Sequence, residues 1–141
     1  MKRIFIVAML AGLAFSGCGD AKKQEKDLLD SVIQIHDRVM GKDDKLMHNK
    51  MKLDTLLKTK LTGVPDTAAA KAMLMGLKIQ LSNAEDGMEN WMQKFTPDQS
   101  GKSHQDIMNY YSIQKKQITA IDSTMGAAIN ASNKYLSQLH N

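Results

Sequence analysis

Apolar residues recur at alternating spacings of four and three along most of the chain. This spacing is typical of helices that pack side by side in a coiled coil, because it places the apolar residues on one side of each helix. We call these residues the seam of a helix. The seam is most regular in a middle segment, where it runs through Ala70, Leu74, Leu77, Leu81, Ala84, Met88, Trp91 and Phe95.

Two further segments repeat the pattern with polar interruptions. The last segment has a seam of Ile107, Tyr111, Gln114, Ile118, Ile121, Met125, Ala128, Ser132, Tyr135 and Leu139. The first has a seam of Leu28, Val32, Ile35, Val39, Leu46, Leu53 and Leu56, with Lys42 and Asn49 at two seam positions. The first helix is therefore predicted to be weakest near its middle, and the pattern leaves open whether it breaks near Gly41.

Short polar segments at 62–66 and 96–102 separate the three seams and contain both prolines of the chain. Ser103 and Asp106 have the form of a capping box, which predicts that the last helix begins at about His104. No segment shows the alternation of a β-strand. We predict an all-α domain over residues 27–141, built from three long antiparallel helices in an up-down-up, coiled-coil-like bundle.

The apolar residues beside the seams are also predicted to be buried. Burial of the seams alone is too small to offset the entropy lost when the backbone is ordered. This argument assigns a structural role to most of the methionines, among them Met40, Met47, Met51, Met73 and Met92.

The first 17 residues have the features of a cleaved secretory signal: Lys2 and Arg3, a short apolar stretch, and small residues before Cys18. The apolar stretch is too short to span a bilayer. The ending 15–18, Phe-Ser-Gly-Cys, resembles the bacterial lipoprotein cleavage box, which implies a lipid on Cys18 followed by a tether over residues 18–26. An ordinary signal peptide that contains a cysteine is the alternative.

The composition narrows the location and the partners. Cys18 is the single cysteine, so the chain contains no internal disulfide, and lipidation explains an unpaired cysteine in an exported protein. Removing the charges of Lys2 and Arg3 lowers the formal net charge from +4 to +2, and no basic run points to nucleic acid. We predict a membrane partner through the lipid and an envelope protein partner. Because Gly19 rather than an aspartate follows Cys18, the outer membrane is favoured over the inner membrane.

Three stretches together resemble a family of small Gram-negative lipoproteins labelled "viral A-type inclusion protein". They are 35–40 (Ile-His-Asp-Arg-Val-Met), 84–92 (Ala-Glu-Asp-Gly-Met-Glu-Asn-Trp-Met) and 111–118 (Tyr-Ser-Ile-Gln-Lys-Lys-Gln-Ile). The first departs from the family pattern, which has a glutamate where this chain has Arg38 and a proline where it has Gly41. The resemblance implies the helical fold and the lipid anchor, and it supplies no catalytic residues.

Histidines and methionines spaced four apart are the candidate metal ligands of the chain. An imidazole and thioethers together suit Cu(I) and related soft ions. The candidate ligands are His36, Met40, Met88, Met92, His104 and Met108. The competing interpretation is a packed, hydrogen-bonded His36, near Met88 and Gln114, with methionines that fill gaps in the core.

Other motifs point to no reaction. The acidic residues Glu85, Asp86 and Glu89 are typical of a solvated helix face, and nothing in the sequence places a nucleophile beside them. We therefore predict a non-enzymatic, lipid-anchored helical module of the cell envelope, exported and without a resident cofactor. The alternative is a periplasmic metal-binding or metal-sensing lipoprotein that uses the histidine and methionine ligands.

Overall fold

The computed structural model describes residues 17–59 and 67–138, which form four helices. They are α1 (Gly17–Met40), α2 (Asp43–Thr59), α3 (Thr67–Lys94) and α4 (His104–Gln138). Helices make up 90% of the described residues, and none of these residues lies in a strand. The all-α prediction is confirmed. Residues 1–16 of the predicted signal sequence and the first interhelical segment, 62–66, lie outside the described part of the chain.

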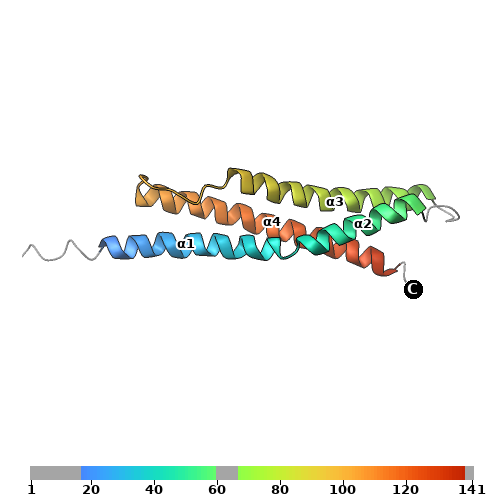
Figure 1. Ribbon diagram of the computed structural model, residues 1–141, viewed down its shortest axis with the longest axis horizontal. Helices are drawn as coiled ribbons and strands as arrows, with labels where there is room; N and C mark the ends of the chain where they lie inside the picture. The colour runs from blue at the N-terminus through green and yellow to red at the C-terminus, as the bar shows by residue number, and fades with distance from the viewer. Residues whose placement is uncertain (1–16, 60–66, 139–141) are drawn as a thin grey trace, which may run out of the picture.

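The molecule is elongated, and α4 is the helix against which the others pack (Figure 1). α4 contains 35 residues, so it is about 50 Å long. α1 packs mainly against the first part of α4, whereas α2 packs against α3 and the last part of α4. α4 therefore contacts each of the other three helices.

The core consists mainly of the predicted seam residues. Val32, Leu46, Leu53, Leu81 and Ile118 are completely buried. In α3, the seam residues from Leu74 to Trp91 are all buried, which confirms the most regular of the three patterns. The polar seam residues Asn49, Gln114 and Ser132 are buried as well.

The methionines beside the seams are exposed, which corrects the prediction that they widen the core. Between 39% and 64% of the surface of Met40, Met47, Met51, Met73 and Met92 is accessible. In contrast, Met88 and Met125 occupy seam positions and are only 3% and 2% exposed. The apolar side is therefore narrow around these methionines, whereas on α4 Ile129 and Leu136, beside the seam, are buried as predicted.

The first predicted helix is interrupted at Gly41 and Lys42. Gly41 N still bonds Asp37 O at 2.9 Å, but Lys42 N bonds Val39 O, three residues back, so the last turn of α1 is tightened. Glycine weakens a helix interior by about 1 kcal/mol relative to alanine, which makes this the place where the helix gives way. Val39 and Leu46, seven residues apart, are both fully buried, so the seam keeps its phase across the break.

The end of α3 and the start of α4 are joined by an ordered loop. As predicted, α4 begins at His104, and Ser103 Oγ accepts a hydrogen bond from Asp106 N at 3.2 Å. The loop contains Gly101 at a φ of 82°, a left-handed conformation that favours glycine. Its ordered backbone fixes the position of the aromatic residues described below.

Candidate functional site

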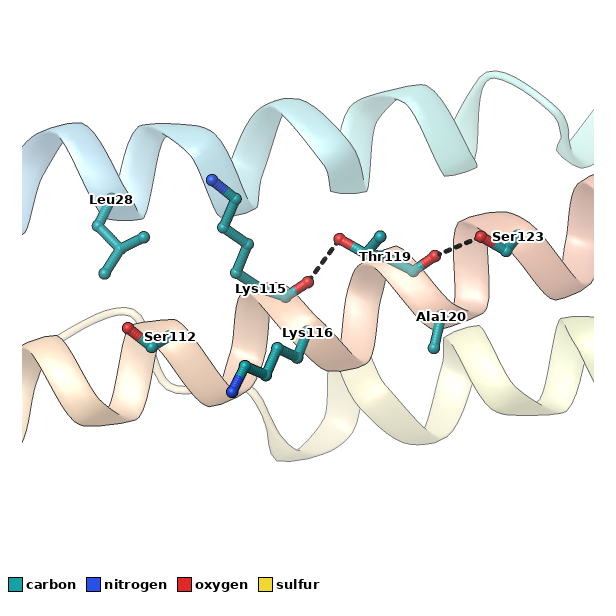
Figure 2. Close-up of a pocket in the computed structure, with 7 residues that line it drawn as sticks. All are labelled: Leu28, Ser112, Lys115, Lys116, Thr119, Ala120 and Ser123. Carbon is teal, nitrogen blue, oxygen red and sulfur yellow. Dashed lines mark hydrogen bonds between the residues drawn. The ribbon is translucent and has the colours of Figure 1, made fainter.

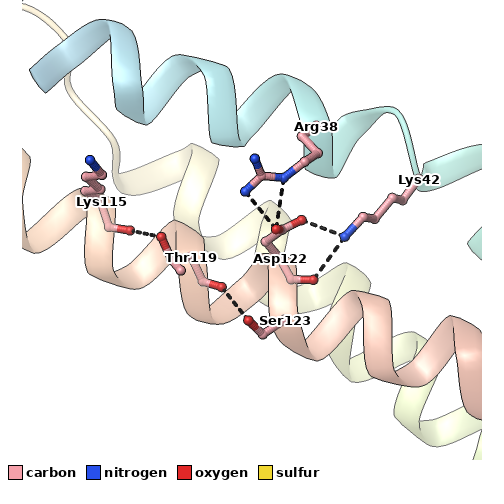
Figure 3. A network of polar contacts seen from close by, with 6 residues as sticks. All are labelled: Arg38, Lys42, Lys115, Thr119, Asp122 and Ser123. Atoms are coloured by element: carbon pink, nitrogen blue, oxygen red, sulfur yellow. Dashed lines mark hydrogen bonds and ion pairs between the residues drawn. The ribbon is translucent and has the colours of Figure 1, made fainter. Parts of the chain in front are cut away.

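A cluster of charged residues joins the end of α1 to the middle of α4 (Figure 3). Arg38 Nε and Nη2 lie 3.0 and 2.9 Å from Asp122 Oδ2, and Lys42 Nζ lies 2.6 Å from Asp122 Oδ1. Lys42 Nζ also donates to the Asp122 backbone oxygen at 3.2 Å. The side chain of Asp122 is 16% exposed. One carboxylate therefore holds two cations from the segment where α1 gives way to α2.

The two cations determine the protonation of Asp122. Burial alone would raise the pKa of this carboxyl, but hydrogen bonds from Lys42 and Arg38 outweigh burial and lower it below the usual range. Lys42 Nζ lies beside Gly126, 3.5 Å from where a Cβ would stand, which is an ordinary contact distance. The seam position of Lys42 is thus explained by an ion pair at the edge of the core.

A buried polar contact lies farther along the same interface. Asn49 Nδ2 donates to Ser132 Oγ at 2.8 Å and to Asn133 Oδ1 at 2.9 Å. Asn49 is 3% exposed and Ser132 is fully buried. Two polar residues that interrupt separate seams therefore meet, and such a pair fixes the register of packed helices.

Aromatic rings form a continuous row at the end of α3. The Trp91 ring stacks on Phe95 with centroids 4.7 Å apart, and Phe95 stacks on Tyr110 at 6.3 Å. On the other side, the His36 ring of α1 lies 6.0 Å from Trp91. Tyr111 continues the row, 5.7 Å from Tyr110. The row links α1, α3 and α4.

Two tyrosines of this row hold the α3–α4 loop. Tyr110 Oη accepts a hydrogen bond from Thr96 N at 2.8 Å, and the Tyr111 hydroxyl donates to Pro97 O at 2.7 Å. Burial raises the pKa of Tyr111, so its hydroxyl stays protonated and able to donate. The loop is therefore fixed against the aromatic row.

The polar atoms of the row differ in their partners. His36 Nδ1 lies 2.8 Å from Asp37 Oδ1, and the His36 side chain is 28% exposed. Trp91 is 6% exposed, and its Nε1 is buried without a hydrogen-bond partner in the described part of the chain. His36 thus lies beside Trp91 at the edge of the core, and its neighbouring carboxylate orients the ring.

The remaining candidate ligands are distributed over two places. Met88 is buried in the core one turn from Trp91, while Met92 follows Trp91 at the surface. His104 lies at the start of α4, where its Nδ1 is 2.7 Å from Glu25 Oε1. Glu25 lies eleven residues before His36, which is about 16 Å along α1. The His36 and His104 groups therefore do not meet around one ion.

Met108 is half-buried on α4, one turn after His104. Within residues 17–59 and 67–138, no group of three or more His, Cys, Asp or Glu side chains could hold a metal ion. Methionine sulfur is not among these ligand types, so metal binding stays a prediction.

A shallow groove runs between α1 and α4 (Figure 2). In Figure 2, Leu28 extends from α1 toward α4, and Lys115 extends from α4 toward α1. The hydroxyls of Thr119 and Ser123 donate to backbone oxygens of α4, at 2.7 and 3.0 Å. These hydroxyls are hydrogen-bonded within α4. The groove is lined by two lysines, Lys115 and Lys116, and by the apolar side chains of Leu28 and Ala120.

Sequence reasoning did not find the partner of Lys42. Asp122 lies outside every seam, and 80 residues separate it from Lys42. The available signal was the pair of polar interruptions in the first seam, since a charged residue at a seam position needs a partner on another helix.

No described helix is both long and apolar enough to cross a bilayer. Comparison of the chain with protein-family models, with curated proteins and with solved structures gives no match in any of the three.

Proposed function

We propose that the protein is a non-enzymatic lipoprotein of the cell envelope, cleaved after Gly17 and anchored to the outer membrane through a lipid on Cys18. The remaining chain forms an up-down-up helical bundle that serves as an interaction module. The observation that supports this is the place of Cys18, the sole cysteine, in the first turn of α1 at one end of an elongated domain (Figure 1). A lipid there would fix one end of the bundle at the membrane.

The anchor is tested by replacing Cys18 with serine and feeding cells an alkyne-tagged fatty acid. We expect the wild-type protein to take up the label and to sediment with outer membranes. The Cys18→Ser protein should take up no label and leave the outer-membrane fraction, because it lacks the acyl chains that hold the wild-type protein stably in the membrane. Helical circular dichroism of both proteins is the control. A wild-type protein without label, or a labelled serine variant, contradicts the anchor.

The interaction surface is proposed to lie over α2 and α3. Met75 and Ile79 are 47% and 55% exposed there, and they line a groove with Leu57. Lys71 and Lys78 flank it, so we propose an envelope protein partner that presents an apolar side chain next to carboxylates.

Photocrosslinking tests this surface. A benzophenone residue at Ile79 should give one heavier adduct in cells, and the same probe at the exposed Thr124 of α4 should give none. Lys71→Glu should abolish the adduct, because the partner's carboxylates would meet a like charge. An adduct of twice the protein's own mass would show self-association instead, and equal labelling from both positions would contradict a specific surface.

A further inference from the structure

We infer that His36, Met40 and Met92, placed around the Trp91 indole, form a binding site for one soft monovalent metal ion, Cu(I) or its congener Ag(I). The inference is independent of the lipid anchor and of the α2–α3 surface. It rests on the relative positions of α1 and α3 beside the break.

The level of each residue follows from two ion pairs between α2 and α3. Lys78 Nζ lies 2.5 Å from Asp54 Oδ1, and Lys50 pairs with Glu85. A step forward on α2 is thus a step backward on α3, so the two helices are antiparallel. Met40 lies fourteen residues before Asp54, and Met92 lies fourteen residues after Lys78. Two full heptads lead from the Asp54–Lys78 pair to Met40 and Met92.

The contact between the His36 and Trp91 rings joins α1 to α3 beside the break. The ring centroids of these residues are 6.0 Å apart. Met40 follows His36 by one helical turn, and Met92 directly follows Trp91. The His36 imidazole therefore lies at the Trp91 indole, and the Met40 and Met92 thioethers belong to the adjoining positions of α1 and α3 at the surface.

The exposure of the two methionines distinguishes them from core residues. Met40 and Met92 are each 40% exposed, so neither is needed to fill the interior, whereas Met88 beneath them is 3% exposed. Thioether sulfur and imidazole are the donors that Cu(I) prefers in proteins. Long, unbranched methionine side chains at the surface can close on an ion without repacking the core.

His36 is oriented for this role. Its Nδ1 faces Asp37 Oδ1 at 2.8 Å, and because a carboxylate only accepts hydrogen bonds, Nδ1 carries the hydrogen and Nε2 is the nitrogen available to an ion. A carboxylate behind a histidine is the usual outer partner of a metal-binding imidazole. The Trp91 ring, 6.0 Å from the His36 ring, has a π-face that attracts positive charge.

The experiment uses the full chain with Cys18→Ser, because a free thiol would bind the same ions. Trp91 is the only tryptophan, so its fluorescence reports on this place alone. We expect Ag(I) to quench it with a sharp end point at one equivalent. Competition with a chromophoric Cu(I) chelator under reducing conditions measures the affinity, and Zn²⁺ should leave the fluorescence unchanged.

Matched variants separate a site from general sulfur binding. Met40→Leu and Met92→Leu conserve volume and should keep the helical spectrum. Each should weaken binding by more than the about 10–100-fold that loss of an outer-shell partner costs, and Asp37→Asn should fall within that range. Met73→Leu, at a 55% exposed position elsewhere on α3, should bind as the parent does. Absence of saturable quenching, or undiminished affinity in both Met40→Leu and Met92→Leu, overturns the inference.

Discussion

Replacing Trp91 with alanine is expected to lower the free energy of unfolding by about 3–5 kcal/mol, the usual cost of deleting a buried aromatic side chain. Trp91 is 6% exposed and lies between His36 and Phe95, so its loss opens a cavity where α1, α3 and the loop meet. Urea denaturation followed by far-ultraviolet circular dichroism measures the change.

Trp91→Phe is the matched control and should be much milder. A phenylalanine ring keeps the stacking on Phe95, and it removes the buried Nε1–H, which has no partner among the described residues. An unpaired buried donor costs about 1–3 kcal/mol, so removing it offsets part of the lost contact area. If the phenylalanine variant is as unstable as the alanine variant, the indole contributes through something other than stacking and burial.

Replacing Asp122 with asparagine is the second large change, with an expected loss of about 1–3 kcal/mol at neutral pH. The loss is below that for a fully buried pair, because Arg38 is 55% exposed and water screens it. Lys42 is only 30% exposed, so its ion pair with Asp122 is screened less by water than that of Arg38, and its loss costs more. The measurement is again urea denaturation, with Asp54→Asn at the half-exposed pair with Lys78 as a control that should lose less.

The effect of Asp122→Asn should depend on pH. Because the folded protein holds the pKa of Asp122 below its unfolded value, ionised Asp122 contributes fully to stability above the unfolded pKa of about 4. That contribution disappears as the pH falls through the lower, folded pKa. The stability difference between the wild type and Asp122→Asn should therefore shrink in acid. A difference that stays constant from neutral pH to pH about 2 would mean that the carboxylate charge is not responsible.

The helices and the core could be predicted because their signals are local. The spacing of Leu74, Leu81 and Met88 fixes which side of α3 is buried, whatever the other helices do. The start of α4 was equally readable, since Ser103 and Asp106 form the cap within four residues of chain. In each case the residues that carry the signal lie within one short segment of the sequence.

The partners of the polar residues could not be predicted because they lie far away in the sequence. Asn49 meets Ser132 across 83 residues, and Arg38 meets Asp122 across 84. The exposure of Met40 and Met92 depends on how close neighbouring helices approach, which hydrophobicity alone does not encode. The break at Gly41 remained open for a related reason: a single glycine weakens a helix, but Lys42 must also find Asp122 beyond the break.

The central position of α4 has a consequence for how the chain is made. Since α4 contacts every other described helix and follows all three in the sequence, α1, α2 and α3 have no complete partner surface until residues 104–138 are present. Chains normally fold from the N-terminus as they emerge, yet packing of these helices would wait for residues 104–138. For the exported lipoprotein proposed above, a chain that stays loosely packed until α4 is made would remain able to thread through a narrow export channel. Deletion of α4 should leave the preceding helices without a stable fold.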